Sequence, residues 1–273
     1  EDERKAARSI GRIRIEIERL ARSGQSSLLI SDENILGGMM NNLADMRLYP
    51  LLNERLMRFL PAFEGRKLRI GLCVRSFDDY WASVLAYHLP RGGSVPDQDL
   101  LDCLTTQPRR WRTLVRSIAA VFPDAEIVVW PFERLAGQPH HQLEVLWDGH
   151  AGPLSDGSFW VNRANGLAAL NEVMALRGER PLREGLVDAD ARWMPFSEDQ
   201  LAVLRADYRR DIAWFKSGAE GLATFIDGRS TPAMPTNRMP DRAIDHSTGG
   251  ITAVHIGGHE NGIEEGLGRT GAS

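Results

Sequence analysis

The stretch Leu68-Arg69-Ile70-Gly71-Leu72-Cys73-Val74 has the length and the nearly continuous apolar composition of a strand that is buried on both faces. A helical pattern runs from Phe77 to Leu89, and its first turn contains Asp78 and Asp79, where carboxylates suit the positive end of the helix dipole. Arg75-Ser76 stands between the two. The segment therefore predicts a buried strand, a short polar turn and a helix.

Two further apolar runs have strand length, Ser27 to Ile30 and Ile127 to Trp130. Helical patterns separate the strands. Leucines step by four from Leu48 to Leu60, and apolar residues step by three and four from Trp111 to Val121. Strands that alternate with helices are typical of an α/β fold. We therefore expect a three-layer α/β domain with a mainly parallel sheet and helices on both faces.

The sequence before and after these strands and helices predicts the limits of the domain. The chain opens on an amphipathic helix around Ile10 to Leu20, and two later helices are expected over Val161 to Leu176 and Ser197 to Phe215. In the last of these, a Ser followed three residues later by Gln has the pattern of a capping box. Beyond Phe225 no aromatic residue occurs. We expect one N-terminally truncated domain over residues 1–226 and a disordered, Gly- and Pro-rich tail over residues 227–273.

Composition argues against several functional classes. The 273 residues carry a net charge of −4, and no basic stripe suggests nucleic acid or an anionic membrane surface. No apolar run approaches the roughly 20 residues that a bilayer span requires. The two cysteines, Cys73 and Cys103, are too few for a disulfide framework. We expect a cytoplasmic protein with no nucleic-acid or membrane partner.

Polar side chains follow the first two strands. Ser31-Asp32-Glu33-Asn34 comes after the first, and Arg75-Ser76 comes after the second. In an open α/β sheet, ligands bind beyond the carboxyl ends of the strands. An Arg at a helix N-terminus, beside free backbone N–H groups, is a natural anion site. Ser83 lies eight residues after Arg75, so it reaches the same site only if the helix crosses the mouth of that site.

Three segments, in order, resemble sulfotransferases. Val74-Arg75-Ser76-Phe77-Asp78-Asp79-Tyr80-Trp81-Ala82-Ser83 is similar to the motif that binds the 3′-phosphate of the nucleotide donor. Leu28 to Leu36 resembles the segment that carries the base in bacterial sulfotransferase-like proteins, and Pro131 to Leu135 resembles a further landmark of those proteins. The similarity extends from about Ser27 to about Phe215.

This resemblance implies a P-loop kinase-like outline and a sulfotransferase activity. The donor would be 3′-phosphoadenosine 5′-phosphosulfate, and the acceptor a hydroxyl or amine of a small molecule or carbohydrate, with no metal. It implies that Arg75 and Ser83 bind the 3′-phosphate and that Glu33 is the general base. The family's 5′-phosphosulfate loop lies upstream of these motifs, and nothing from Glu1 to Gly24 matches it.

Other interpretations of the same residues stay open. Pairing with surface carboxylates is an alternative role for Arg75, and a bond to its own helix backbone is an alternative for Ser83. The alternative for Glu33 is to favour a helix start that Ser31 or Asp32 caps. The alternative functions are a magnesium-dependent phosphoryl transferase, with Asp32 as metal ligand, and a non-catalytic interaction module of the same fold.

Two features are candidates for contacts with the acceptor. Acceptor pockets in the family vary in their loops, and the segment from Tyr87 to Val95 is the first such loop to consider. Trp81 is a second candidate, although packing in the core is the usual role of such a residue.

Overall fold

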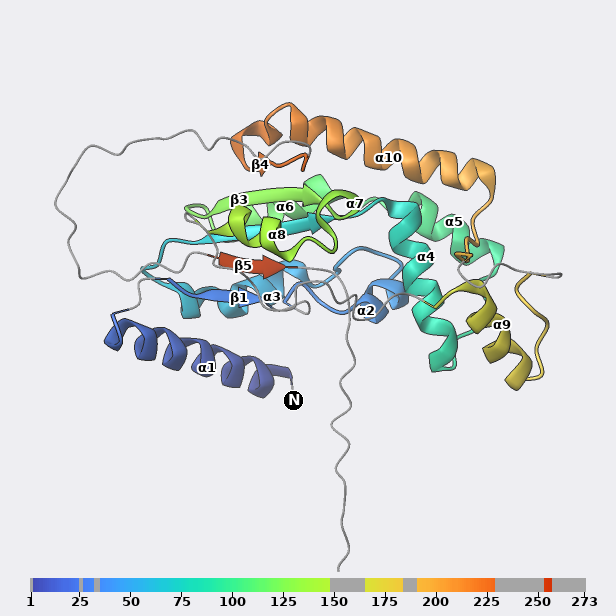
Figure 1. The fold of residues 1–273 in the computed structure, drawn as a ribbon, viewed down its shortest axis with the longest axis horizontal. Helices are drawn as coiled ribbons and strands as arrows, with labels where there is room; N and C mark the ends of the chain where they lie inside the picture. Colours follow the sequence, from blue (N-terminus) through green and yellow to red (C-terminus); the bar gives the residue numbers. More distant parts are fainter. Residues whose placement is uncertain are drawn as a thin grey trace, which may run out of the picture.

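The computed structural model describes residues 2–24, 27–31, 35–147, 165–183, 191–228 and 253–256. Five strands form one sheet in the order β1-β5-β2-β3-β4, and each neighbouring pair is parallel (Figure 1). Their bounds are β1 Leu29–Ser31, β2 Arg69–Val74, β3 Glu126–Pro131, β4 Thr224–Phe225 and β5 Ala253–Ile256. The predicted α/β class with a parallel sheet is confirmed.

The pair β2–β3 forms the longest ladder of the sheet. Its register runs from Arg69 opposite Glu126 to Val74 opposite Pro131, and both strands are almost entirely buried. A Cβ added at Gly71 would stand 2.5 Å from the Trp130 ring. The glycine in this strand therefore makes room for an indole, because the sheet and the layer beside it are tightly packed.

Strand β5 comes from the segment that we expected to be a tail. It pairs with β1 on one side and with β2 on the other, so a segment from near the end of the chain lies inside the sheet. No sequence pattern predicts a strand there, since four residues between Gly-rich stretches carry too short a pattern to recognise. The expectation of disorder for the rest of the segment after Gly228 lies outside the described residues.

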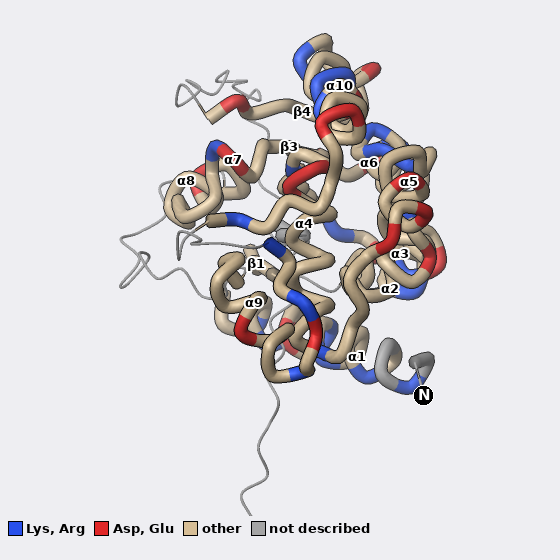
Figure 2. Tube along the Cα trace, turned by 90° about the vertical axis from the view of Figure 1, so that its right-hand side faces the viewer, with Lys and Arg blue, Asp and Glu red and all other residues tan. Residues whose placement is uncertain are grey.

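Helices lie on both sides of the sheet. Figure 2 shows α3 and α6 on one side and α7 and α8 on the other, while α1 runs along the β1 edge in Figure 1. Their bounds are α1 Asp2–Arg22, α3 Leu52–Phe59, α6 Trp111–Val121, α7 Phe132–Leu135 and α8 Pro139–Leu146. The leucines expected at four-residue steps are buried at Leu52 and Leu56, whereas Leu60 begins a 3-10 turn and is exposed.

Of the remaining helices, α2, α4, α5 and α9 lie toward the carboxyl ends of the strands, and α10 runs along the β4 edge of the sheet (Figure 1). Their bounds are α2 Met39–Ala44, α4 Phe77–His88, α5 Gln98–Thr106, α9 Leu167–Leu176 and α10 Glu198–Lys216, with 3-10 turns at Leu60–Phe63, Leu89–Arg91 and Ala219–Gly221. The capping box predicted for the last long helix is present, because Ser197 and Gln200 bond each other's backbone N–H groups at the start of α10. Helix α4 is buried over most of its length.

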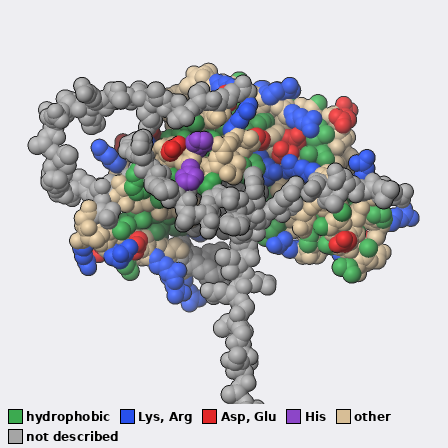
Figure 3. All heavy atoms as spheres, in the orientation of Figure 1, with side chains coloured by type: hydrophobic (Ala, Val, Ile, Leu, Met, Phe, Trp, Pro, Cys, Tyr) green, Lys and Arg blue, Asp and Glu red, His purple; other side chains and the backbone are tan. Residues whose placement is uncertain are grey.

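The core contains three indoles that are almost completely buried, those of Trp81, Trp111 and Trp130. Core packing therefore accounts for Trp81, which has no exposed surface to offer an acceptor. On the face drawn in Figure 3, Lys and Arg side chains are spread over the described surface among acidic and apolar ones. Among the described residues, no helix combines the length and apolar character that a membrane span needs.

Candidate functional site

Arg75 lies at the carboxyl edge of the sheet, one residue after β2 and beside the end of β3. Because Val74 pairs with Pro131, the Arg75 side chain stands next to Phe132, and its guanidinium carbon lies 4.6 Å from the centroid of that ring. The Arg75 carbonyl accepts a 2.7 Å hydrogen bond from Nε1 of Trp111. The backbone and the aromatic ring thus hold Arg75 at the strand end.

The guanidinium of Arg75 lacks a partner for part of its hydrogen-bonding capacity. Its Nε is buried and makes no hydrogen bond, and no ion pair joins the group to another described residue. Burial lowers the pKa of Arg75, and the nearby charge of Arg192 lowers it further, while Asp79 and Glu133 act in the opposite direction. Arg75 is half-buried, and leaving its buried Nε–H without an acceptor is unfavourable, so an anion that accepts from this group would relieve that cost.

The first amide of the neighbouring helix is already occupied. Glu133 Oε1 accepts from the backbone N–H of Ser76 at 2.8 Å, and the same carboxylate accepts from the Tyr208 hydroxyl at 2.9 Å through Oε2. Burial, followed by the charge of Glu133, raises the pKa of Tyr208. The expectation of free backbone N–H groups beside Arg75 is therefore wrong for Ser76, because a carboxylate of the protein already satisfies that amide.

A second carboxylate with its own hydrogen-bond donors, that of Asp78, lies in the first turn of α4. Asp78 accepts from the hydroxyl of Ser76 and, at 2.7 Å, from Nε of Arg205. Burial alone would raise the pKa of Asp78, but hydrogen bonds from these two donors outweigh it, so the pKa lies below its ordinary value. The Ser76 amide and the Asp78 carboxylate are thus satisfied within the protein, while Nε of Arg75 has no hydrogen-bond partner.

Ser83 lies inside α4 and is buried, with 7% of its surface exposed. It follows the N-cap Ser76 by seven residues, or about 10 Å along the helix axis. No hydrogen bond joins Ser83 to Arg75 among the described residues. The structure thus brings Arg75 together with Ser76, Phe132 and Glu133, and the role of Ser83 as a second phosphate ligand stays a prediction.

The proposed base cannot be placed against Arg75, since Asp32, Glu33 and Asn34 lie outside the described residues. The strand that precedes them is placed. β1 ends at Ser31, and one strand, β5, separates it from β2 at the same carboxyl edge. Neighbouring strands lie about 4.8 Å apart, so the ends of β1 and β2 are about 10 Å from each other.

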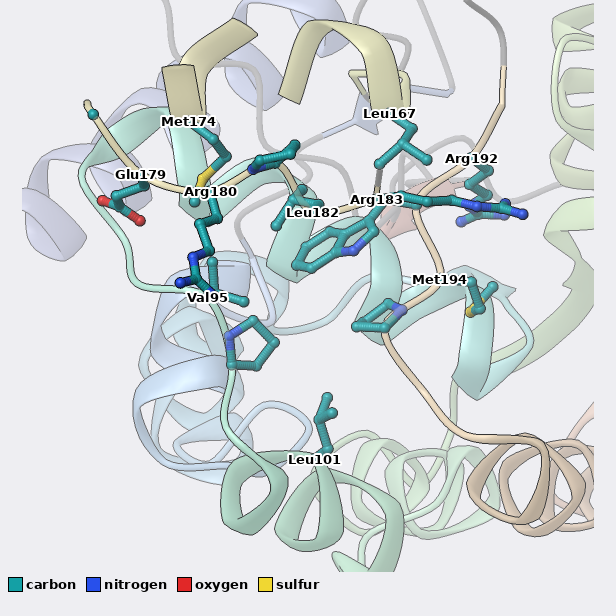
Figure 4. Close-up of a pocket in the computed structure, with 15 residues that line it drawn as sticks. Val95, Leu101, Leu167, Met174, Glu179, Arg180, Leu182, Arg183, Arg192 and Met194 are labelled. Atoms are coloured by element: carbon teal, nitrogen blue, oxygen red, sulfur yellow. The ribbon is translucent and has the colours of Figure 1, made fainter. Parts of the chain in front are cut away.

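A cavity of about 820 Å³ lies close to this edge, between α5, α9 and the segments 178–183 and 192–195 (Figure 4). Arg192 lines the cavity and donates to Asp79 in the first turn of α4, the helix that follows Arg75. Val95, at the end of the loop expected to contact the acceptor, also lines it. The cavity and Arg75 therefore border the same part of the fold.

Sequence reasoning missed several residues of this region. The sequence pattern marks Glu133 only as part of a landmark segment and does not mark Arg192 or Tyr208. Arg192 stands in an irregular stretch, and Tyr208 occupies a mid-helix position that looks like any other, so neither has a local pattern. Their partners lie 113 and 75 residues away in sequence, which only the fold reveals.

Within the described ranges, no group of three or more His, Cys, Asp or Glu side chains is placed to hold a metal ion. The chain matches no protein-family model, no curated protein and no solved structure.

Proposed function

We propose that this protein is a sulfotransferase that uses 3′-phosphoadenosine 5′-phosphosulfate, with Arg75 as a ligand of the 3′-phosphate. The observation that carries the proposal is the half-buried Arg75 side chain, whose buried Nε has no hydrogen-bond partner at the carboxyl edge of a parallel sheet. Ligands of open α/β sheets bind at this edge, and guanidinium groups suit phosphate. The three-layer, P-loop kinase-like outline is part of the same proposal.

The proposed reaction transfers a sulfuryl group to the acceptor and a proton from the acceptor to the base. The acceptor oxygen or nitrogen attacks sulfur as the bond from sulfur to the 5′-phosphate oxygen breaks, and adenosine 3′,5′-bisphosphate leaves. Glu33 takes the acceptor proton. Arg75, with Ser83 as the second ligand, fixes the far end of the nucleotide and so aligns the sulfuryl group for in-line transfer.

A second candidate function is a non-catalytic interaction module of the same fold, which binds no nucleotide. It is favoured by the contacts of Glu133, whose carboxylate already occupies the Ser76 amide at the start of α4. A bound phosphate would meet that carboxylate close to Arg75, and the like charges would repel each other. The two candidates therefore differ in nucleotide binding as well as in turnover.

Transfer from donor labelled in its sulfuryl group to a panel of hydroxyl and amine acceptors tests the proposal. A parallel assay with ATP as donor, with and without a chelator, tests magnesium-dependent phosphoryl transfer, which the chelator would stop. Glu33→Gln keeps the size of the side chain and removes its basicity, so we expect turnover to fall by about 10²–10⁴ with nucleotide affinity unchanged. Absence of both nucleotide binding and transfer to any acceptor would favour the interaction module, and a fully active Glu33→Gln variant would remove Glu33 from the mechanism.

A further inference from the structure

The cavity beside α9 has an apolar interior. Leu101 from α5, Leu167 and Met174 from α9, and Leu182, Trp193 and Met194 from the two adjoining segments line it. Leu101, Leu167, Met174 and Trp193 are buried. The volume of about 820 Å³ lies within the range of pockets that enclose a small organic molecule. The interior therefore suits an apolar body, such as a ring system.

The rim of the cavity is positively charged. Three arginines line it, Arg180, Arg183 and Arg192, and Glu179 is the one carboxylate among the described lining residues. Glu179 is already neutralised by Arg177, whose Nη2 lies 2.9 Å from its Oε1. Arg192 pairs with Asp79, whereas Arg180 and Arg183 are exposed and form no ion pair with a described residue. Two positive charges thus stay available at the mouth.

Hydrogen bonds fix the segments that carry these arginines. Asn171 of α9 accepts from the Leu182 amide at 2.8 Å and donates to the Arg183 carbonyl at 3.2 Å. Arg177 donates to the carbonyls of Leu89 and Gly93 and so attaches the loop on the other side. The walls are therefore formed before any ligand arrives, which lowers the entropic cost of binding.

We propose that this cavity binds the acceptor, and that the acceptor is a small organic anion: an apolar body with a carboxylate, sulfate or phosphate group that Arg180 and Arg183 contact. Figure 4 shows Arg180 on the Glu179 side of the cavity and Arg192 on the Met194 side. Arg192 also bonds Asp79, three residues after Ser76, and its charge acts on Arg75, so one wall of the cavity lies near the Arg75 edge. The acceptor assignment rests on the proposed function; the class of ligand rests on the cavity alone.

A matched pair of fluorescent probes tests the ligand class. 8-Anilinonaphthalene-1-sulfonate and N-phenyl-1-naphthylamine share a ring system, and only the first carries a negative charge. We expect the double variant Arg180→Gln/Arg183→Gln to weaken binding of the sulfonate about tenfold and binding of the neutral probe less than about twofold. Both positions are exposed, so the fold tolerates the change. Met194→Gln, in the apolar wall, should weaken both probes.

Arg58→Gln is the control, because Arg58 is an exposed arginine of α3 outside the cavity. An equal loss for both probes in the double variant, no loss for the sulfonate, or the same loss in the control would overturn the assignment of an anionic ligand.

Calorimetry with adenosine 3′,5′-bisphosphate separates this proposal from the proposed function. If the cavity is the acceptor site, the nucleotide binds with unchanged affinity in the presence of saturating sulfonate probe. Competition between the two would place the probe in the nucleotide site and overturn the acceptor assignment. Failure of the nucleotide to bind, with the probe pattern intact, would overturn the proposed function and the acceptor role while the anionic ligand class stands.

Discussion

Two arginines of this fold, Arg75 and Arg110, have similar surroundings but differ in their hydrogen bonds. Each guanidinium lies over a phenylalanine ring, Arg75 at 4.6 Å from the centroid of Phe132 and Arg110 at 5.3 Å from that of Phe77. Burial is the largest cause that lowers the pKa of both. Arg110 donates to the Asp207 carboxylate, whereas Nε of Arg75 donates to nothing. Burial alone therefore does not decide what such a side chain does.

This difference in hydrogen bonding indicates a structural role for Arg110 and leaves Arg75 as the candidate for binding a ligand. Asp207 also pairs with Arg210, and the nearby Asp211 accepts from the Trp111 amide at 2.8 Å. Trp111 connects the two regions, since its indole donates to the Arg75 carbonyl. A buried network of paired charges fixes one arrangement of the core, while a group without a hydrogen-bond partner at a strand end is retained at a cost to stability.

Asp207→Ala should give the largest effect on stability. It leaves the buried Arg110 guanidinium without its carboxylate, and loss of one partner of a buried pair costs about 3–5 kcal/mol. Urea denaturation measures the change. The matched control is Arg210→Ala, which removes the other partner of the same carboxylate; its side chain is 63% exposed, so a loss below about 1 kcal/mol is expected. Equal losses for the two variants would mean that the buried Asp207–Arg110 pair contributes no more to stability than the exposed Asp207–Arg210 pair does.

Asp211 should give a pH-dependent effect of about 2 kcal/mol. Burial raises its pKa to about 6 from 3.8, so between these values the folded state holds a proton that the unfolded chain releases. The contribution of this group to stability therefore falls as the pH rises through that window. Asp211→Asn keeps an acceptor for the Trp111 amide and removes the titration.

Urea denaturation at about pH 4.5 and about pH 7 measures this effect. The stability of Asp211→Asn relative to the original chain should improve by about 2 kcal/mol between the two pH values. A relative stability that is the same at both would show that Asp211 does not titrate there.

Arg75→Met should give the smallest effect on stability. The variant keeps an unbranched side chain over Phe132 and removes the buried Nε–H, which has no hydrogen-bond partner, so we expect a change within about 1 kcal/mol, with a gain as the favoured direction. The same denaturation assay measures it. A loss as large as that of Asp207→Ala would mean that Arg75 is held by the protein as firmly as Arg110 is.

The sequence predicted those parts of the fold whose pattern is local. β2, β3 and α4 follow from a continuous apolar run, a polar turn and an amphipathic repeat, and the start of α10 follows from the Ser197 and Gln200 pair. β5 was missed, because its four residues owe their strand conformation to pairing with β1 and β2 and not to a pattern of their own.

The candidate site divides in the same way. The position of Arg75 after a strand was visible in the sequence, whereas the Glu133 carboxylate on the Ser76 amide depends on two strands ending side by side. The charged cavity was missed for the same reason, since Arg183 and Arg192 approach it from segments that carry no motif.

The central claim is that Arg75 binds the 3′-phosphate of a nucleotide, and calorimetry of the Arg75→Met variant tests it most directly. Adenosine 3′,5′-bisphosphate and adenosine 5′-phosphate differ in that group alone. A charge-assisted contact contributes about 1.5–3 kcal/mol, so the variant should bind the bisphosphate at least about tenfold more weakly than the original chain does and the monophosphate almost equally well. Equal losses for the two nucleotides, or no loss for either, would contradict the claim.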